Sequence, residues 1–492
     1  MTLQQENVDT LEKDSTVEWR DGLDLARMIR DKSVSPREAV EDVIARASRV
    51  NPKLNAICET LYDSARAAAD VPLTGDAENA PFAGVPTYIK DLFMPLQGVK
   101  MTNGSELCRA AIAPVDGTLI ARMRKAGFGI LGTTASPEFG TSFATESKLH
   151  GITRNPWSPD HTPGGSSGGA AALVAARVLP IAHGNDGGGS LRVPASCCGV
   201  FGLKPSRGRV PIGPMVGEGW GGMGINHVIT LSVRDSAAVL DATAGMEPGA
   251  PYAAPQQGAG FLTATQTPPR ALRIGRVDGL APWPTDPECI EAVNQSAKLC
   301  EELGHTVVPI ALPVDAWEFY HNVFNIIGAQ TKSFLNLVAM MSGQPTDLEL
   351  LEARTRVILR EKGDISGATY AASIDWIHAF GRQMAHVMSG VDVLLMPTLA
   401  KPPVKTGALD LDDSASFKNL VTCFHSFSPL TPLFNASGQP AMSVPLHWSP
   451  EGLPIGTQFA AGFGQEELLF ALAAQLEEAR PWAGRRPPIC AI

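Results

Sequence analysis

The stretch that most constrains this chain is residues 163–194, PGGSSGGAAALVAARVLPIAHGNDGGGSLRVP. An alanine-rich run, long enough for about three helical turns, separates two glycine-rich turns. The first turn presents Ser166 and the second presents Ser190. Glycine adopts positive φ without strain and lets backbone N–H groups approach a bound oxygen, because it has no Cβ. The stretch therefore predicts one compact unit that carries two serines in glycine turns.

The second turn has the composition of an anion-binding loop. Gly187, Gly188 and Gly189 precede Ser190. The N–H groups of these four residues could form a nest for a developing oxyanion. Ser190 is therefore a candidate nucleophile.

Two other interpretations of the first turn stay open. GGSSG matches the G-x-S-x-G nucleophile elbow, which would make Ser166 or Ser167 the nucleophile of an α/β-hydrolase. This short pattern is weak evidence in a chain with 48 glycines. The turn also fits a flexible linker, but its apolar flanks favour a packed segment.

A serine nucleophile needs a base, and the ten histidines give no local sign of a Ser-His-Asp triad. His183 lies at the expected end of a strand, where a structural role is favoured. Lys90 ends the apolar run VPTYI, and burial can lower the pKa of a lysine until its neutral amine serves as a base. From its local sequence alone, however, Lys90 reads as a surface lysine beside Asp91.

Three sequence blocks together resemble the signature of a known family. They are GVPTYIKD, PGGSSGGAAA and HGNDGGGSLRVPASCCGVFGLKPSRGRV, with 76 residues from Lys90 to Ser166 and 24 from Ser166 to Ser190. Their order and spacing are similar to those of the amidase signature family. Further similar segments are RNPW at 154–157, LLMPTLA at 394–400 and FNASGQPAMSVP at 434–445.

The resemblance implies an α/β protein of the amidase-signature fold, with a large mixed β-sheet covered on both faces by helices. It also implies a serine hydrolase that cleaves C–N bonds of amides through an acyl-enzyme. Carried over residue by residue, Ser190 is the nucleophile and Lys90 is the base. Ser166 is the serine that bridges them, after a cis peptide bond from Gly165.

The resemblance also implies supporting roles. Ser167 is expected to support the bridging serine by hydrogen bonding, while Asp186 and Arg192 brace the site. The oxyanion donors are the N–H groups of residues 187–190. Where the family commonly reads GTDTGGS, this chain reads GNDGGGS. Gly187 thus replaces a residue with a side chain, and a looser oxyanion loop is expected.

Composition argues against several classes of protein. The net charge is −10 and no Lys/Arg block stands out, so nucleic-acid binding is not expected. No run of about 18 apolar residues predicts a membrane span. The eight cysteines contain no C-x-x-C pair, which is typical of free thiols in a reducing cytoplasm; neither a metal site nor a cofactor is expected. Residues 1–15 are polar, lack a secretory signal and are expected to form a tail.

Residues 16–492 are expected to form a single domain, because helices and strands alternate as in a sheet covered on both faces. Residues 208–224 read as a loop that carries Trp220 near a pocket. Their G-x-G-x-x-G is not taken as a dinucleotide site, since no strand leads into it. The expected helices cover two segments within 19–50, then 60–69, 117–126, 232–245, 286–304, 317–341, 348–363, 369–387 and 466–478. The expected strands cover 128–134, 272–277 and 305–312 (the last two in a βαβ unit), 391–399, and a hairpin of 435–448 with 454–462.

Apolar segments around Trp220 and within 317–341 predict a roomy hydrophobic pocket. The expected partner is a small-molecule amide or carbamate: bulky or apolar linear, cyclic or aryl amides are favoured, and esters are also considered. A homodimer is left open. An alternative function is the glutamine-hydrolysing subunit of an amidotransferase, which shares the triad but acts with a partner.

Overall fold

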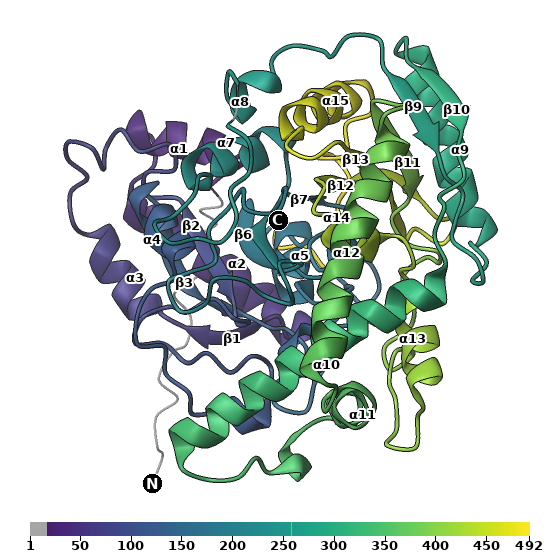
Figure 1. Ribbon diagram of the computed structural model, residues 1–492. Helices are drawn as coiled ribbons and strands as arrows, with labels where there is room; N and C mark the ends of the chain where they lie inside the picture. Colours follow the sequence, from purple (N-terminus) through teal and green to yellow (C-terminus); the bar gives the residue numbers. More distant parts are fainter. Residues whose placement is uncertain (1–16, 257) are drawn as a thin grey trace, which may run out of the picture.

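The computed structural model describes residues 17–256 and 258–492, and the tail expected at residues 1–15 lies outside them (Figure 1). The α-helices are α1 (Gly22–Arg30), α2 (Pro36–Leu54), α3 (Tyr62–Ala69), α4 (Thr118–Lys125), α5 (Gly168–Ala175), α6 (Arg192–Cys198), α7 (Val233–Thr243), α8 (Phe261–Ala264), α9 (Pro287–Glu302), α10 (Ala316–Ser342), α11 (Ala353–Lys362), α12 (Gly367–Met388), α13 (Phe417–His425), α14 (Thr431–Ser437) and α15 (Glu466–Ala479).

The strands form one large sheet and two small ones. The large sheet has the order β10-β9-β11-β13-β12-β7-β8-β6, and the small sheets are β1-β3-β2 and β4-β5. The strands are β1 (Ile57–Thr60), β2 (Pro86–Lys90), β3 (Gly129–Thr134), β4 (Glu146–Ser147), β5 (Gly151–Ile152), β6 (Ile181–Asp186), β7 (Phe201–Lys204), β8 (Ile225–Thr230), β9 (Arg273–Arg276), β10 (Thr306–Pro309), β11 (Val393–Pro397), β12 (Ala441–Trp448) and β13 (Pro454–Ala461).

Local signals in the sequence explain where α2 begins. The Ser35 side chain accepts a hydrogen bond from the Glu38 N–H, and the Glu38 carboxylate accepts one from the Ser35 N–H at 2.7 Å. Pro36 occupies the first helical position, where a missing N–H costs nothing. This reciprocal cap satisfies donors that a helix start otherwise leaves unpaired.

The large sheet is mixed, as predicted. β10 and β11 both run parallel to β9, and α9 connects β9 to β10, which confirms the βαβ unit. β13 runs antiparallel to both β11 and β12, and the pairing of β12 with β13 confirms the hairpin. β7, β8 and β6 continue the sheet with antiparallel pairs.

Alternate side chains of the central strand β11 enter two different apolar clusters. Val393 and Leu395 pack with residues of α9 and α15, whereas Leu394 and Met396 pack with residues of α10 and α12. Successive side chains of a strand point to opposite faces, so helices cover both faces of this sheet (Figure 1). The predicted α/β architecture is confirmed.

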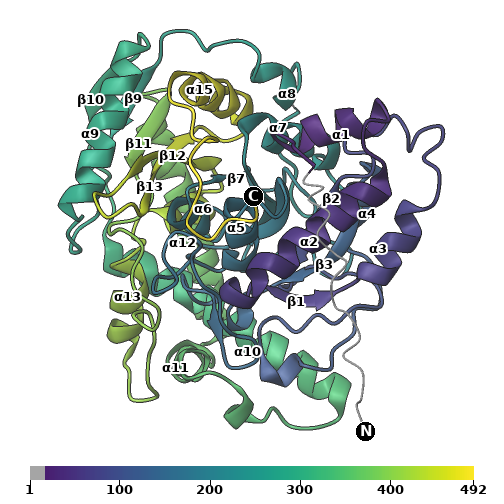
Figure 2. The same cartoon turned by 180° about the vertical axis from the view of Figure 1, so that it is seen from behind.

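The sheet β1-β3-β2 lies beside the edge strand β6 of the large sheet. The Thr87 hydroxyl donates to the Ile181 carbonyl at 3.0 Å, and the Lys90 N–H donates to His183 Nδ1 at 3.2 Å. A third apolar cluster, formed largely by α2 and α5, covers this junction; both helices lie on the side seen in Figure 2. Lys90 therefore lies where the two sheets meet.

Several elements were not predicted, namely β1, β4, β5, β7, β8, α6, α8, α13 and α14. Residues 208–224 contain no helix or strand, in agreement with the expected loop. No helix within residues 17–256 and 258–492 combines the length and the apolar character that a membrane crossing requires.

Candidate active site

Three segments that are far apart in the sequence bring the predicted catalytic residues together. Lys90 is the last residue of β2, Ser166 lies in the turn before α5, and Ser190 lies in the turn between β6 and α6. The peptide bond between Gly165 and Ser166 is cis. A Cβ on Gly165 would lie 2.9 Å from the backbone of Ala144, so only a glycine fits this close approach.

The Lys90 side chain is fully buried, with 0 % exposure. Its Nζ lies 2.7 Å from Ser166 Oγ and 2.6 Å from Asn185 Oδ1. Burial lowers the pKa of Lys90 well below its ordinary value and outweighs the opposing charge of Asp186. The interpretation of Lys90 as a surface lysine is therefore wrong, and the structure favours an uncharged amine.

His183 lies within β6 and does not approach the serines as a base would. Its Nδ1 accepts the Lys90 backbone N–H. Burial, and then the proximity of Lys90, lower the pKa of His183 to about 3. His183 is therefore neutral and in contact with the backbone, in agreement with the structural role expected for it.

The serines differ in what they face. Ser190 lines a cavity together with Gly187 and Gly188, whereas Ser166 is not among the residues that line it. The Ser167 N–H donates to the Ser190 carbonyl at 3.3 Å, and its hydroxyl donates to the Asn185 carbonyl at 3.1 Å. Ser167 thus ties the two serine turns together through the backbone.

The glycine turn before Ser190 is held by Asp186. The Gly189 N–H donates to Asp186 Oδ1 at 2.7 Å, and the Leu191 N–H donates to Asp186 Oδ2 at 3.1 Å. The predicted set of oxyanion donors therefore becomes smaller, because the Gly189 N–H is already engaged. The N–H groups of Gly187, Gly188 and Ser190 stay available in the described part of the chain.

Asp186 and Arg192 form a buried ion pair behind this turn, with 3.0 Å between Arg192 Nη2 and Asp186 Oδ1. Burial alone would raise the pKa of Asp186, but the Arg192 guanidinium outweighs burial and lowers it to about 2. Arg192 also donates to Asn435 Oδ1 and Gln458 Oε1, at 2.7 and 2.8 Å. The pair thus joins the turn to α14 and β13.

The cavity in front of Ser190 has a volume of ≈ 510 Å³, part of which is open to solvent. No Asp, Glu, Lys or Arg is among its lining residues. They are mainly small, apolar or aromatic: Gly140, Thr141, Ser142, Phe143, Gly187, Gly188, Ser190, Trp220, Val323, Phe324, Ile327, Phe424, His425 and Pro432. The expected hydrophobic pocket thus lies at Ser190.

His425 behaves as a neutral aromatic wall of this cavity. Its ring stacks on Tyr320 at 3.9 Å between centroids and meets Phe143 and Phe324 edge to face at 5.4 and 5.7 Å. Burial lowers the pKa of His425 to about 3. The ring therefore carries no charge near neutral pH.

Trp220 reaches the cavity from the loop 208–224 and packs directly on Gly187. A Cβ on Gly187 would lie 2.6 Å from the Trp220 ring, which is closer than packed atoms approach. The Trp220 N–H donates to Gln330 Oε1 at 2.6 Å, which holds the loop against α10. Trp220 therefore occupies the space that a side chain at position 187 would need.

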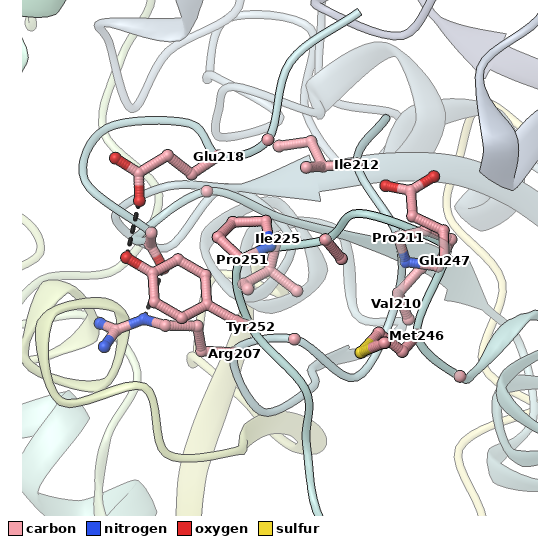
Figure 3. Close-up of a pocket in the computed structure, with 16 residues that line it drawn as sticks. Arg207, Val210, Pro211, Ile212, Glu218, Ile225, Met246, Glu247, Pro251 and Tyr252 are labelled. Atoms are coloured by element: carbon pink, nitrogen blue, oxygen red, sulfur yellow. Dashed lines mark hydrogen bonds between the residues drawn. The ribbon is translucent and has the colours of Figure 1, made fainter. Parts of the chain in front are cut away.

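A second pocket of ≈ 410 Å³ lies on another side of the same loop (Figure 3). The Tyr252 hydroxyl donates to Glu218 at 2.7 Å across it, while Ile212, Ile225 and Pro251 lie between Glu218 and Glu247. Lys90, Ser166 and Ser190 do not line this pocket. It is therefore separate from the candidate active site.

Cys58, Asp91 and His150 bring donor atoms suited to metals within 4.8 Å of one another. Asp91 already accepts hydrogen bonds from the N–H of Thr102, at 2.7 Å, and from its hydroxyl. Burial, and then the charges of Asp91 and Glu59, raise the pKa of the Cys58 thiol well above its ordinary value. Asp91 is therefore already engaged by Thr102, which lies outside this cluster.

The model of the amidase family matches residues 38–470 of this sequence. The chain belongs to the amidase signature family. It is 35 % identical over 485 residues to the 6-aminohexanoate-cyclic-dimer hydrolase of Paenarthrobacter ureafaciens, across 96 % of this chain and 97 % of that one. The protein is therefore an amidase, a hydrolase of C–N bonds in amides.

Two solved structures show the same architecture. A 6-aminohexanoate cyclic dimer hydrolase complexed with substrate aligns with a TM-score of 0.89 and 33 % identity over 95 % of this chain and 98 % of that one. A bacterial aryl acylamidase of the amidase signature family aligns with a TM-score of 0.85 and 29 % identity, covering 96 % and 100 %. The amidase-signature fold predicted from sequence is confirmed.

Sequence reasoning missed three side chains that shape the site. Asn185 contacts Lys90, Asn435 contacts Asp186 and Arg192, and the Thr431 hydroxyl donates to the Gly188 carbonyl at 2.7 Å. Asn435 stands within the segment FNASGQP that resembles the family, which was a signal for it. Asn185 stands where the common GTDTGGS sequence of the family has a threonine. That difference could have drawn attention to Asn185.

Proposed function

We propose that this amidase hydrolyses uncharged amides with apolar or aryl groups, using Ser190 as nucleophile, Ser166 as proton bridge and Lys90 as base. The observation that carries the proposal is the burial of Lys90, with its Nζ 2.7 Å from Ser166 Oγ, next to a cavity lined by Ser190. In the part of the chain that the structure describes, no carboxylate contacts this buried amine, which suits it to accept a proton near neutral pH.

In the proposed mechanism, neutral Lys90 takes the proton of Ser166 while Ser166 Oγ takes the proton of Ser190. Ser190 Oγ then attacks the amide carbonyl carbon, and the carbonyl oxygen becomes an oxyanion. The N–H groups of Gly187, Gly188 and Ser190 are the candidate donors to that oxyanion. Ser166 returns a proton to the leaving nitrogen as the C–N bond breaks, and water hydrolyses the acyl-enzyme.

The cavity supports an uncharged substrate. Its walls are mainly apolar or aromatic, and His425 adds no charge near neutral pH. Burying an unpaired charge there would be costly. A cyclic dimer of an amino acid has neither a free amine nor a free carboxylate, and an aryl amide is also uncharged, so both substrate types named for the similar enzymes suit this lining. Carbamates and esters present the same carbonyl chemistry, and we include them as candidate substrates.

The glutamine-hydrolysing alternative is less well supported. Glutamine carries an ammonium and a carboxylate, and both would need partners in the cavity. The lining residues offer no Asp, Glu, Lys or Arg. We therefore expect hydrolysis of aryl amides by the purified chain alone, with glutamine as a much poorer substrate.

The test combines a substrate panel with covalent labelling. The purified chain is assayed on an anilide, a matched aryl carbamate, an aryl ester and glutamine, and the residue labelled by a fluorophosphonate is mapped by mass spectrometry. Label on Ser190 is expected. It should vanish in Ser190→Ala, whereas Ser166→Ala should slow labelling but leave the label on Ser190. Label on Ser166 or Ser167 in the wild type would revive the nucleophile-elbow interpretation, and a preference for glutamine would favour the amidotransferase subunit.

A further inference from the structure

The Asn185 side chain contacts both Lys90, at the end of β2, and Leu92 in the segment that follows β2. Asn185 Oδ1 lies 2.6 Å from Lys90 Nζ, and Asn185 Nδ2 donates to the Leu92 carbonyl at 2.8 Å. The Asn185 backbone is fixed as well, because its carbonyl accepts from the Ser167 hydroxyl at 3.1 Å. The amide therefore spans from β6 to both sides of Asp91.

These two contacts fix the orientation of the amide group. The Leu92 carbonyl can only accept a hydrogen bond, so the amide nitrogen must face it. The carbonyl oxygen of Asn185 must then face Lys90. That oxygen can only accept, and it therefore takes one N–H of the amine.

A neutral lysine amine has two N–H groups and one lone pair. When one N–H is held by Asn185, the rotation of the amine is restricted. The lone pair can then be directed at Ser166 Oγ, which lies 2.7 Å from the same nitrogen. Without Asn185, the amine would rotate freely and present the lone pair to Ser166 for a smaller part of the time.

We propose that Asn185 is a positioning residue that aims the lone pair of Lys90 at Ser166 and accepts a hydrogen bond from the lysine once it is protonated. The inference rests on the proposed function, since it assigns Asn185 a part in the same relay. Asn185 acts through Lys90 and needs no contact with substrate.

The charges around Lys90 make its protonation sensitive to Asn185. Asp186 acts on the amine from β6, while Asp91 is occupied by Thr102 and His183 is neutral. Asp186 is itself paired with Arg192. The Asn185 amide oxygen, 2.6 Å from Lys90 Nζ, is uncharged and therefore allows the amine to lose its proton. A carboxylate at position 185 would instead favour the protonated, charged amine.

The experiment measures the pH dependence of Ser190 labelling by the fluorophosphonate, together with kcat/KM on an anilide, in two variants. The acid limb of the pH profile is the range in which the rate rises as Lys90 loses its proton. Asn185→Asp should move this limb to higher pH by about 1–3 units, because a carboxylate beside an amine favours its charged form. Asn185→Leu removes the acceptor, so the limb should move to lower pH. The maximal rate in Asn185→Leu should fall by about 10- to 150-fold, as for the loss of a hydrogen bond to a charged group.

Asn155→Asp is the matched control. Asn155 is a fully buried asparagine, whereas Asn185 is half-buried, and Asn155 donates to the Thr162 and Cys197 carbonyls instead of approaching Lys90. The same chemical change there should leave the acid limb where the wild type has it. If Asn185→Asp fails to fold, judged by circular dichroism, the downward shift in Asn185→Leu decides the matter.

The outcomes separate this inference from the proposed function. If the wild type is not labelled at Ser190, or if Lys90→Ala keeps the wild-type rate, the proposed function fails. If the wild type passes both tests and the acid limb stays unchanged in both Asn185 variants, or moves in the same direction in both, the role of Asn185 alone is overturned.

Discussion

The Lys90 side chain lies fully buried at the end of β2, and its pKa is lowered by burial from an ordinary value of 10.5. A lysine with a lowered pKa loses its proton as the pH rises through that pKa, and it becomes protonated again on acidification. We therefore predict that kcat/KM on an anilide rises with pH to a plateau, with an acid limb well below pH 10.5. A pH profile between mildly acidic and alkaline conditions measures this limb.

Lys90→Ala tests whether the limb belongs to Lys90. The variant should lose about 10²- to 10⁴-fold in rate, the usual contribution of a general base. Below the ordinary lysine pKa it should resist acid unfolding better than the wild type, because the penalty for burying a charged amine is gone. An acid limb that persists in the residual activity of this variant would assign the limb to another group.

Gly187 departs from the family wording, and the structure supplies the reason. The Trp220 ring occupies the space in which a side chain would lie, at 2.6 Å from a built Cβ. Gly187→Ala should displace Trp220, cost about 1–3 kcal/mol of stability through overpacking, and lower kcat/KM for bulky anilides because the cavity wall moves. Gly217→Ala in the same loop is the control, because its Cβ would keep an ordinary 3.5 Å contact with Pro251. Equal kinetics for the two variants would show that the Trp220 contact does not shape the cavity.

At the scale of whole elements, the sequence predicted the helices and strands that have clear local signals. The capping box of Ser35 and Glu38 marked α2, and the βαβ pattern marked β9, α9 and β10. The four-residue strand β7 and the seven-residue helix α14 were not predicted, because short buried segments have too little periodicity to identify. α13 carried a usable signal, a capping box between Ser416 and Asn419, which the sequence analysis did not recognise.

The residues of the site also divide into those that a local sequence signal marks and those that only the folded structure reveals. Ser166 and Ser190 were marked by their glycine turns, and the family blocks marked Lys90. The burial of Lys90 could not be derived locally, since it arises where β2 packs beside β6, a strand about 90 residues later in the chain. The engagement of the Gly189 N–H by Asp186 also depends on how the turn closes, which the run of glycines leaves undetermined.

At the scale of the whole molecule, one prediction concerns metals. In residues 17–256 and 258–492, the Cys58, Asp91 and His150 cluster has suitable donors, but Thr102 already donates to Asp91 and the Cys58 thiol stays protonated. We predict that activity survives treatment with EDTA followed by its removal. Activity that is lost on chelation and restored by one particular metal would contradict the proposed mechanism.

The Asp186–Arg192 pair connects parts of the chain that are more than 200 residues apart. Both side chains are fully buried, and Arg192 also donates to Asn435 of α14 and Gln458 of β13. Removing one partner of a buried pair leaves an uncompensated charge, which costs about 3–5 kcal/mol. Arg192→Met should therefore lower the thermal midpoint strongly, whereas Arg270→Ala, which breaks a pair whose arginine is 69 % exposed, should change it little.

The pH dependence of stability provides the second measurement on this pair. The folded-state pKa of Asp186 is lowered to about 2, so its contribution to stability is present above the ordinary aspartate value of 3.8 and is lost as the pH falls through about 2. Thermal midpoints of the wild type and Arg192→Met should accordingly differ most near neutral pH and converge as the pH falls through this window. A difference that stays constant down to pH 2 would mean that Arg192 stabilises the molecule by packing rather than by pairing with Asp186.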